Sequence, residues 1–307
     1  MNKPLISIAC ISYNHDRYIE QAINSWLNQI VDCDFEIVIG DDKSTDNTLQ
    51  IIQLFKDKYP EKIKVLDNSS NLGVMRNFAR TLNSCSGSYI AICEGDDYWP
   101  DNQKLQLQLD VLRANPNIAL CFTNAEILYE DTKNTKLVFT NKIEQQFSFK
   151  EYLNNYSPIP TASMFFKNVI SKHSFDHFYD FLSGDYVLRF ILGDHGDFYY
   201  LNKVTAVYRK HEQGVSKAYA NSKHIENGFK LNSILDKEYN HKYSFFLRRH
   251  NYPQYEKLVY AYIREKSYFR AMRNFPNALF ATKYKLRSIS EIIVLIKSCI
   301  KLSITRS

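Results

Sequence analysis

Three carboxylates, Glu94, Asp96 and Asp97, stand within four residues of one another, directly after the apolar run Tyr89–Cys93. Carboxylates crowded at the end of a buried strand repel one another unless a cation neutralises them. A hard divalent ion, Mn²⁺ or Mg²⁺, binds oxygen ligands and can bridge two phosphates. The cluster therefore predicts a metal site for a ligand that carries phosphate.

Three further apolar runs also end in polar residues suited to a nucleoside diphosphate. They are Leu5–Ile11, followed by Ser12-Tyr13-Asn14; Glu36–Ile39, followed by Asp41-Asp42; and Ile63–Leu66, followed by Asn71 and Arg76. Neither the GxGxxG motif of dinucleotide sites nor the GxxxxGK[ST] motif of P-loops is present. Taken alone, each segment is equally typical of a turn, a loop or a helix cap. Their coincidence at successive strand ends favours one nucleotide site.

The elements between these runs must bring the polar residues together. Helical patterns at 17–29, 46–59 and 74–84 alternate with the apolar runs, which we interpret as strands. Apolar strands separated by helices indicate a parallel sheet covered on both faces. Right-handed crossovers place the carboxyl ends of such strands along one edge, where open α/β sheets bind ligands.

The later sequence predicts further elements and a second region. We expect helices at 101–113, 149–154, 167–172 and 184–192, and strands at 118–122, 126–129, 162–166 and 204–208. From about residue 219 the pattern is helical to the end, with helices at 255–263 and 268–281 and an apolar segment at 289–304 that Glu291, Lys297 and Lys301 interrupt. We therefore expect a catalytic domain over 1–220 and a basic helical region over 221–307.

Six segments resemble those of the family 2 glycosyltransferases, which have the GT-A fold. They are SIACISYN (7–14), EIVIGDDKSTDNT (36–48), NLGVMRN (71–77), SYIAICEGDDYW (88–99), SGDYVL (183–188) and YRKHEQGVS (208–216). The resemblance covers about residues 1–220, and EGDDYW is similar to the form in bacterial surface-polysaccharide transferases. It implies a Rossmann-like, mostly parallel sheet. It also implies an enzyme that moves a sugar from a nucleoside-diphosphate sugar, most often a UDP-sugar, to an acceptor hydroxyl.

The resemblance also implies roles for individual residues. Nucleotide-sugar contacts fall on Ser12, Tyr13, Asn14, Asp41, Asp42, Asn71, Arg76, Asp96 and Arg209; metal ligands fall on Asp96 first, then Asp97, Glu94 and His211; the catalytic base falls on Asp185. Two positions depart from the family pattern: Glu94 replaces an aspartate, and Gly184 replaces an acidic residue before Asp185. Judged from the residues alone, Asp185 is more typical of a helix cap than of a catalytic base, and His211 is equally typical of an isolated exposed histidine.

One base and one metal suffice for direct displacement at the anomeric carbon, which inverts its configuration. The chain has no Gln-x-x-Arg-Trp stretch of the processive polymerases, which favours transfer of a single sugar. A sugar nucleotidyltransferase is the alternative enzyme, but it needs a Gly-rich basic loop after the first strand. A non-catalytic sugar-binding protein is the other alternative, and it would be expected to lose Asp185 or the metal carboxylates.

Charge is distributed unevenly along the 307 residues. The net charge is +6, yet residues 242–307 hold 14 Lys and Arg against 3 Asp and Glu, a net +11, which leaves about −5 for the rest. Basic helices with interleaved aromatic residues suit an anionic membrane surface, and a lipid-linked glycan acceptor would fit such a partner. A helical bundle with a solvated basic face is the alternative. Nucleic acid is disfavoured because no reading motif is present.

The predicted compartment is the cytoplasm, with peripheral attachment to the membrane's inner face. The six cysteines lie far apart with no CxxC pair, which is typical of free thiols in a reducing compartment. The first ten residues carry too short an apolar run for a signal peptide, and no run reaches the length of a membrane span.

Overall fold

The computed structural model describes residues 5–66, 68–140, 144–155, 158–214 and 221–282. The chain divides into two compact units, Met1–His211 and Glu212–Ser307.

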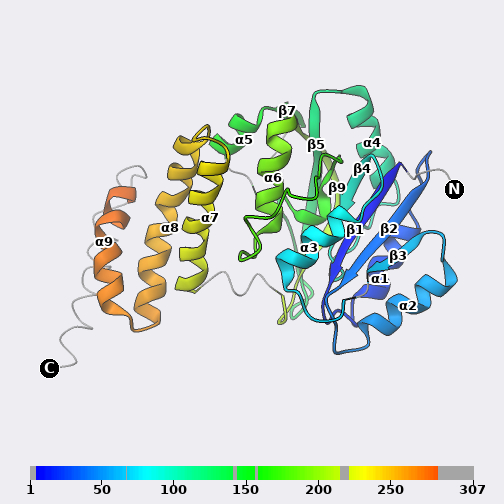
Figure 1. Ribbon diagram of the computed structural model, residues 1–307, viewed down its shortest axis with the longest axis horizontal. Helices are drawn as coiled ribbons and strands as arrows, with labels where there is room; N and C mark the ends of the chain where they lie inside the picture. The colour runs from blue at the N-terminus through cyan, green and yellow to red at the C-terminus, as the bar shows by residue number, and fades with distance from the viewer. Residues whose placement is uncertain (1–4, 67, 141–143, 156–157, 215–220, 283–307) are drawn as a thin grey trace. The chain divides into compact units, whose positions relative to one another are not determined.

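The first unit is built on a mixed sheet that holds nine strands among the described residues (Figure 1). They are β1 (Ile6–Ser12), β2 (Phe35–Asp41), β3 (Ile63–Leu66), β4 (Tyr89–Ile92), β5 (Ile118–Tyr129), β6 (Thr135–Leu137), β7 (Gln145–Phe147), β8 (Phe165–Lys167) and β9 (Asp197–Lys210). Their order is β3-β2-β1-β4-β8-β5-β9-β7, and β6 pairs with β5.

Strand direction decides which loops meet. Strands β1 to β4 pair in parallel, β8 runs antiparallel between β4 and β5, and β9 is parallel to β5. Strands β5 and β9 therefore run in the direction of β4. The carboxyl ends of β1, β2, β3, β4 and β9 consequently lie along the same edge of the sheet.

Helices cover both faces of this sheet. The apolar side chains of α1 (Ile19–Leu27), α2 (Thr48–Lys58) and α4 (Lys104–Ala114) share one core with Ile6, Ile8 and Cys10 of β1. On the other face, α3 (Val74–Asn83) packs on β1 and β2 and contacts α6 (Gly184–His195), with the short α5 (Phe149–Asn155) beside β9 (Figure 1). The α/β fold predicted from the alternating pattern is confirmed.

Several predicted boundaries differ from the observed ones. The helix expected at 167–172 is wrong, because 165–167 form β8 and the following residues are turns and loop. The separate strands expected at 118–122 and 126–129 form one strand, β5, since the polar residues Thr123 and Asn124 between them are also buried in the sheet. Strands β6 and β7 were not predicted; each has three residues, most of them exposed, and shows no apolar periodicity.

The second unit is helical where it is described. It consists of α7 (Ser222–Glu238), α8 (Ser244–Arg264) and α9 (Tyr268–Thr282), and the helix predicted at 255–263 is the second half of α8. Its core contains Ile225, Leu258, Val259, Tyr262 and Ala271. Residues 289–304, which the sequence marks as an apolar segment, lie outside the described residues. Within the described part of the chain, no helix combines the length and apolar character needed to cross a bilayer.

Candidate functional site

The loop after β4, residues 93–99, contains Glu94, Asp96 and Asp97, and we call it the acidic loop. It lies tightly against the loop after β1. The backbone N–H of Gly95 donates to the carbonyl of Ile11 at 3.0 Å. A Cβ atom at position 95 would stand 2.9 Å from both Ser12 Oγ and His15 Nδ1, which is closer than a Cβ atom comes to other heavy atoms in folded proteins. Glycine at 95 therefore permits the contact that brings the acidic loop beside His15.

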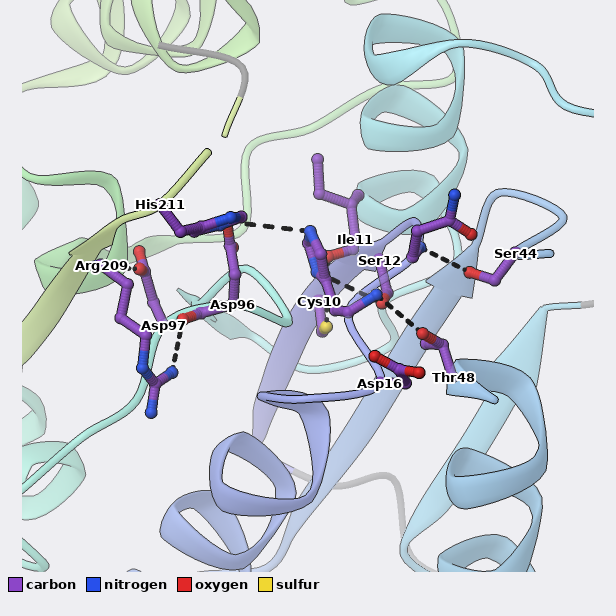
Figure 2. Close-up of polar contacts among 12 residues, drawn as sticks. Cys10, Ile11, Ser12, Asp16, Ser44, Thr48, Asp96, Asp97, Arg209 and His211 are labelled. Carbon is purple, nitrogen blue, oxygen red and sulfur yellow. Dashed lines mark hydrogen bonds and ion pairs between the residues drawn. The ribbon is translucent and has the colours of Figure 1, made fainter. Parts of the chain in front are cut away.

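Asp96 contacts two imidazoles from different loops, and Figure 2 shows it beside that of His211. Its Oδ2 atom is 3.0 Å from Nε2 of His211, which follows β9, and 3.7 Å from Nε2 of His15. Burial acts to raise the pKa of Asp96, but the charge interaction with His15 and the hydrogen bond from His211 outweigh it, so the pKa lies below its ordinary value. Burial lowers the pKa of His15. Asp96 is thus held as a carboxylate.

The pKa values of Glu94 and Asp97 are shifted upward, opposite to that of Asp96. Burial raises the pKa of Glu94 to about 8, with help from the charges of Asp96 and Asp185. Its Oε2 atom is buried and has no hydrogen-bond partner among the described residues. Burial and the charges of Asp96 and Glu94 raise the pKa of Asp97, although its Oδ1 accepts the backbone N–H of Arg209 at 2.9 Å. Perturbed carboxyl groups gathered at a strand end are typical of functional sites.

Arg209 is buried, and its guanidinium is fully engaged. It donates to the carbonyl of Asp96 and to Oε1 of Gln21, and its Nε lies 3.2 Å from Oε1 of Glu130. It also lies over the ring of Tyr98, 4.5 Å from the centroid. These contacts brace the acidic loop against α1 and β5. Contact of Arg209 with a nucleotide stays a prediction, and it would require exchange of these partners.

Asp41 and Asp42, at the end of β2, have different surroundings although both are buried. The carboxylate of Asp42 accepts the backbone N–H groups of Leu72 at 2.7 Å and Gly73 at 2.9 Å. Among the described residues, the carboxylate of Asp41 accepts only from Ser44, through its backbone N–H at 2.9 Å and its hydroxyl. Asp42 therefore fixes the loop after β3, whereas Asp41 retains acceptor capacity for a further donor.

The loop after β1 is pinned to the loop after β2. Asn14 adopts a left-handed backbone (φ 57°), and its Oδ1 accepts the N–H of Thr45 at 2.8 Å while its own N–H donates to Ser44 Oγ at 2.9 Å. These bonds leave Tyr13 with 45% of its surface exposed at the same edge. Ser12 is buried, and its hydroxyl lies 3.4 Å from Nδ1 of His15.

Asn71 and Arg76 flank the start of α3. The Asn71 amide donates to the carbonyl of Asp42 at 2.9 Å. Arg76 is exposed, and its guanidinium carbon stands 4.6 Å from the ring centroid of Tyr179. Asn71 thus joins the contacts of the loop after β3, while Arg76 presents a charge beside an aromatic ring.

Asp185 stands in the first turn of α6, with its side chain 28% exposed and 3.0 Å from Arg189 NH2. Its charge contributes to the raised pKa of Glu94, which places it in electrostatic reach of the acidic loop. A Cβ atom at Gly184 would lie 2.7 Å from the ring of Phe78. The close packing of α6 on α3 thus explains why glycine stands where the family carries an acidic residue.

The residues of the acidic loop fit a divalent metal in the chemistry of their donor atoms. Glu94 offers a buried carboxylate oxygen without a partner, and Asp96 and His211 offer an oxygen and a nitrogen 3.0 Å apart. A cation would relieve the repulsion that raises the pKa of Glu94. In the described part of the chain no three His, Cys, Asp or Glu side chains are already arranged around one point. Metal binding would therefore require Asp96 to exchange a histidine partner.

The structure thus brings Glu94, Asp96, Asp97, Arg209 and His211 together, at the sheet edge that also carries the loops of Ser12 to Asn14 and of Asp41 and Asp42. Sequence reasoning missed His15 and Ser44. The position of His15, three residues after the end of β1, was a usable signal. The role of Ser44 depends on the left-handed residues Asn14 and Lys43, which no pattern reveals.

Comparison with known proteins identifies the family. The model of Glycosyl transferase family 2 matches residues 7–174, more than half of the chain, and the chain belongs to that family. It is 36% identical over 131 residues to the putative teichuronic acid biosynthesis glycosyltransferase TuaG of Bacillus subtilis, covering 42% of this chain and 50% of that protein. It is 34% identical over 143 residues to the UDP-Glc:alpha-D-GlcNAc-diphosphoundecaprenol beta-1,3-glucosyltransferase WfgD of Escherichia coli, covering 47% and 54%. The matches span about half the length of these relatives.

Solved structures confirm the fold. The TarS 1–349 fragment of S. aureus in complex with UDP-GlcNAc superposes with a TM-score of 0.57 at 17% identity, covering 95% of this chain and 79% of that one. The mannosyltransferase PcManGT of Pyrobaculum calidifontis, in complex with GDP-Man and Mn²⁺, gives 0.55 at 14% identity, covering 98% and 81%. The predicted family and GT-A fold are therefore confirmed.

Proposed function

We propose that this chain is an inverting, non-processive glycosyltransferase, which moves one sugar from a nucleoside-diphosphate sugar to an acceptor hydroxyl in bacterial surface-polysaccharide synthesis. One observation carries the proposal. Asp96, which stands beside Glu94 and Asp97 at the carboxyl edge of the sheet, contacts His211 and His15, and Glu94 lies within electrostatic reach of Asp185. A loop of buried and half-buried carboxylates with no Lys partner in its described contacts is suited to a cation and a diphosphate.

Asp185 is the proposed base. Its carboxylate is partly exposed, so an acceptor hydroxyl can reach it, and Arg189 in the next turn holds it in place at 3.0 Å. The carboxylate would accept the hydroxyl proton as the oxygen attacks the anomeric carbon from the face opposite the departing diphosphate.

Asp96 is the proposed principal metal ligand, with Glu94, Asp97 and His211 around it. A bound Mn²⁺ or Mg²⁺ would neutralise charge on the leaving diphosphate. The residues of this chain keep the ligand carboxylate ionised and aimed, because the imidazole of His211 fixes Asp96 and Arg209 braces its backbone. Ser12, Tyr13, Asn14, Asp41, Asn71, Arg76 and Arg209 are the proposed nucleotide-sugar contacts, and Asp42 is proposed to support them by fixing the loop after β3.

The proposed donor is a UDP-sugar and the proposed acceptor a glycan or lipid-linked glycan. The names of WfgD and of the TarS complex contain UDP-sugars, and WfgD is named for a diphosphoundecaprenol substrate. PcManGT is named with GDP-Man, so a guanosine donor belongs in any test. A lipid-linked acceptor would place the enzyme at the cytoplasmic face of an anionic membrane.

A panel of UDP-, GDP-, CMP- and dTDP-sugars, read by calorimetry and by product release, tests this function. We expect one nucleotide class to bind with Mn²⁺ or Mg²⁺, and EDTA to abolish turnover. Asp96→Ala should lose metal-dependent donor binding with the fold retained, while Asp57→Ala, an exposed aspartate on α2, should behave as wild type. Unchanged turnover in EDTA would refute the metal role. Release of pyrophosphate from a nucleoside triphosphate and a sugar phosphate would indicate the nucleotidyltransferase, and binding without turnover the non-catalytic alternative.

A further inference from the structure

Helix α9 exposes apolar side chains on the face opposite its core. Ala271 and Ala278 are buried, whereas Phe269 is 81% exposed and Met272 61%. At 100° per residue, Phe269, Met272 and Pro276 project within about 60° of one another, roughly opposite the two buried alanines. We call this surface, Phe269, Met272 and Pro276, the outer face of α9.

Arginines flank the outer face. Arg270 and Arg273 are both exposed and project along one side of the same stripe. Residues 244–282, from α8 to the end of α9, hold seven Lys and Arg against two Asp and Glu, a net +5. The charge of this surface is therefore complementary to an anionic partner. The partner must also offer an apolar environment in which the side chains of Phe269 and Met272 can be buried.

We propose that the outer face of α9 docks on an anionic lipid surface, with Phe269 and Met272 entering the acyl boundary and Arg270 and Arg273 at the lipid headgroups. An interfacial helix buries large apolar side chains at the headgroup boundary and carries basic side chains that reach anionic lipids, and α9 exposes both kinds on its solvent side. Lying flat suits it, since α9 is too short and too polar to cross a bilayer. The inference deepens the proposed membrane partner, but it stands without glycosyl transfer.

The experiment is vesicle sedimentation of the full chain, without donor or acceptor, on phosphatidylglycerol-containing and pure phosphatidylcholine vesicles. Phe269→Ser/Met272→Ser should lower partitioning to anionic vesicles by at least about tenfold, because two apolar side chains no longer leave water. Ile30→Ser/Leu54→Ser is the matched control, since these side chains are 61% and 70% exposed in the first unit. It should partition as wild type does.

Charge is tested separately. Arg270→Gln and Arg273→Gln should each lower partitioning to anionic vesicles roughly fivefold and leave the weak binding to neutral vesicles unchanged. Equal binding of the wild type to both vesicle types would overturn the proposal. So would a serine double variant that binds anionic vesicles as well as the control does.

A Phe269→Trp variant distinguishes a lipid surface from a protein partner on the outer face. We expect its emission to resemble that of exposed tryptophan in buffer and to shift to the blue on anionic vesicles. Emission that is blue-shifted in buffer and unchanged by vesicles would show that residues 283–307 or a second copy cover the face, which overturns the proposal. Because no nucleotide is present, failure here leaves the proposed enzymatic activity untouched.

Discussion

Two adjacent aspartates show how the site separates support from recognition. Asp42 accepts the backbone N–H groups of the loop that it holds, whereas the carboxylate of Asp41 accepts, in the part of the chain that the structure describes, only from Ser44. A carboxylate bonded by several N–H groups cannot be lost without leaving buried donors unpaired. A carboxylate with unused lone pairs at the ligand edge can bind a donor group of a nucleotide.

We therefore expect the two alanine variants to differ. Asp42→Ala should lower the free energy of unfolding by about 2–3 kcal/mol, because two buried backbone donors lose a charged acceptor. Asp41→Ala should weaken nucleoside diphosphate binding by about 1–3 kcal/mol, the loss of a hydrogen bond to a charged group. Denaturant melts and calorimetry on both variants provide the comparison. Unchanged nucleotide affinity in Asp41→Ala would show Asp41 to be a turn residue only.

The types and positions of the acidic residues could be predicted from the sequence, but not their partners. Runs of carboxylates at strand ends follow from local pattern, and parallel connections bring them to one edge. The contact of His211 with Asp96 joins residues 115 apart in the sequence. It depends on β8 running antiparallel to both β4 and β5, so that β5 and its parallel neighbour β9 run in the direction of β4. No local signal encodes that topology.

At the scale of elements, helix α4 supports the acidic loop through a buried lysine. Lys104 is fully buried, its amine donates to Gln108 Oε1 and lies 4.5 Å from the ring centroid of Trp99. Gln108 in turn donates to the carbonyls of Cys121 and Ser163, each at 3.0 Å. The network therefore links α4, β5 and the end of the acidic loop.

Lys104 makes stability depend on pH. Burial lowers its pKa to about 7, against about 10.4 in the unfolded chain. Between these values the unfolded state binds a proton that the folded state does not, so the free energy of unfolding rises with pH by up to about 1.4 kcal/mol per unit. Relative to Lys104→Met, we expect the wild type to gain stability from pH 7 to 9 in urea titrations. Parallel pH curves for the two proteins would contradict this account.

The predictions of helices and strands were correct where buried residues recur at a regular spacing in the sequence, and they failed where no such spacing is present. Helices α1 to α4 have apolar stripes, and β1 to β4 are short buried runs, so both types were predicted within a few residues. The predicted helix at 167–172 was wrong because the chain there leaves strand β8. The side chains of Phe165 and Phe166 in β8 are buried, and the strand pairs with β4 on one side and β5 on the other. Sequence alone does not contain that pairing.

At the scale of the whole molecule, the two parts of the sequence carry charge of opposite sign. The acidic first part holds the residues proposed for diphosphate and metal binding, and the basic last part suits an anionic surface. Stable membrane attachment usually needs two signals. The outer face of α9 supplies one, and the apolar segment 289–304, which lies outside the described residues, is the predicted second.

Deleting residues 289–307 should therefore release the protein from anionic liposomes while a soluble acceptor analogue is still glycosylated. Flotation of the full chain and the deletion, together with turnover of the analogue, provides the measurement. Wild-type protein that floats no better than the deletion would favour a packed helical bundle.

The central claim, that Asp185 acts as base in a glycosyl transfer, is tested most directly by Asp185→Asn. Asparagine keeps the size of the side chain and can cap a helix as aspartate does, but it cannot accept a proton near neutral pH. We expect turnover with a confirmed donor and acceptor to fall at least about 10²-fold, while calorimetric donor affinity stays unchanged. Asp194→Asn, near the other end of α6, is the control and should retain turnover. Near-wild-type turnover in Asp185→Asn would contradict the account and leave Asp185 as a structural residue of the first turn.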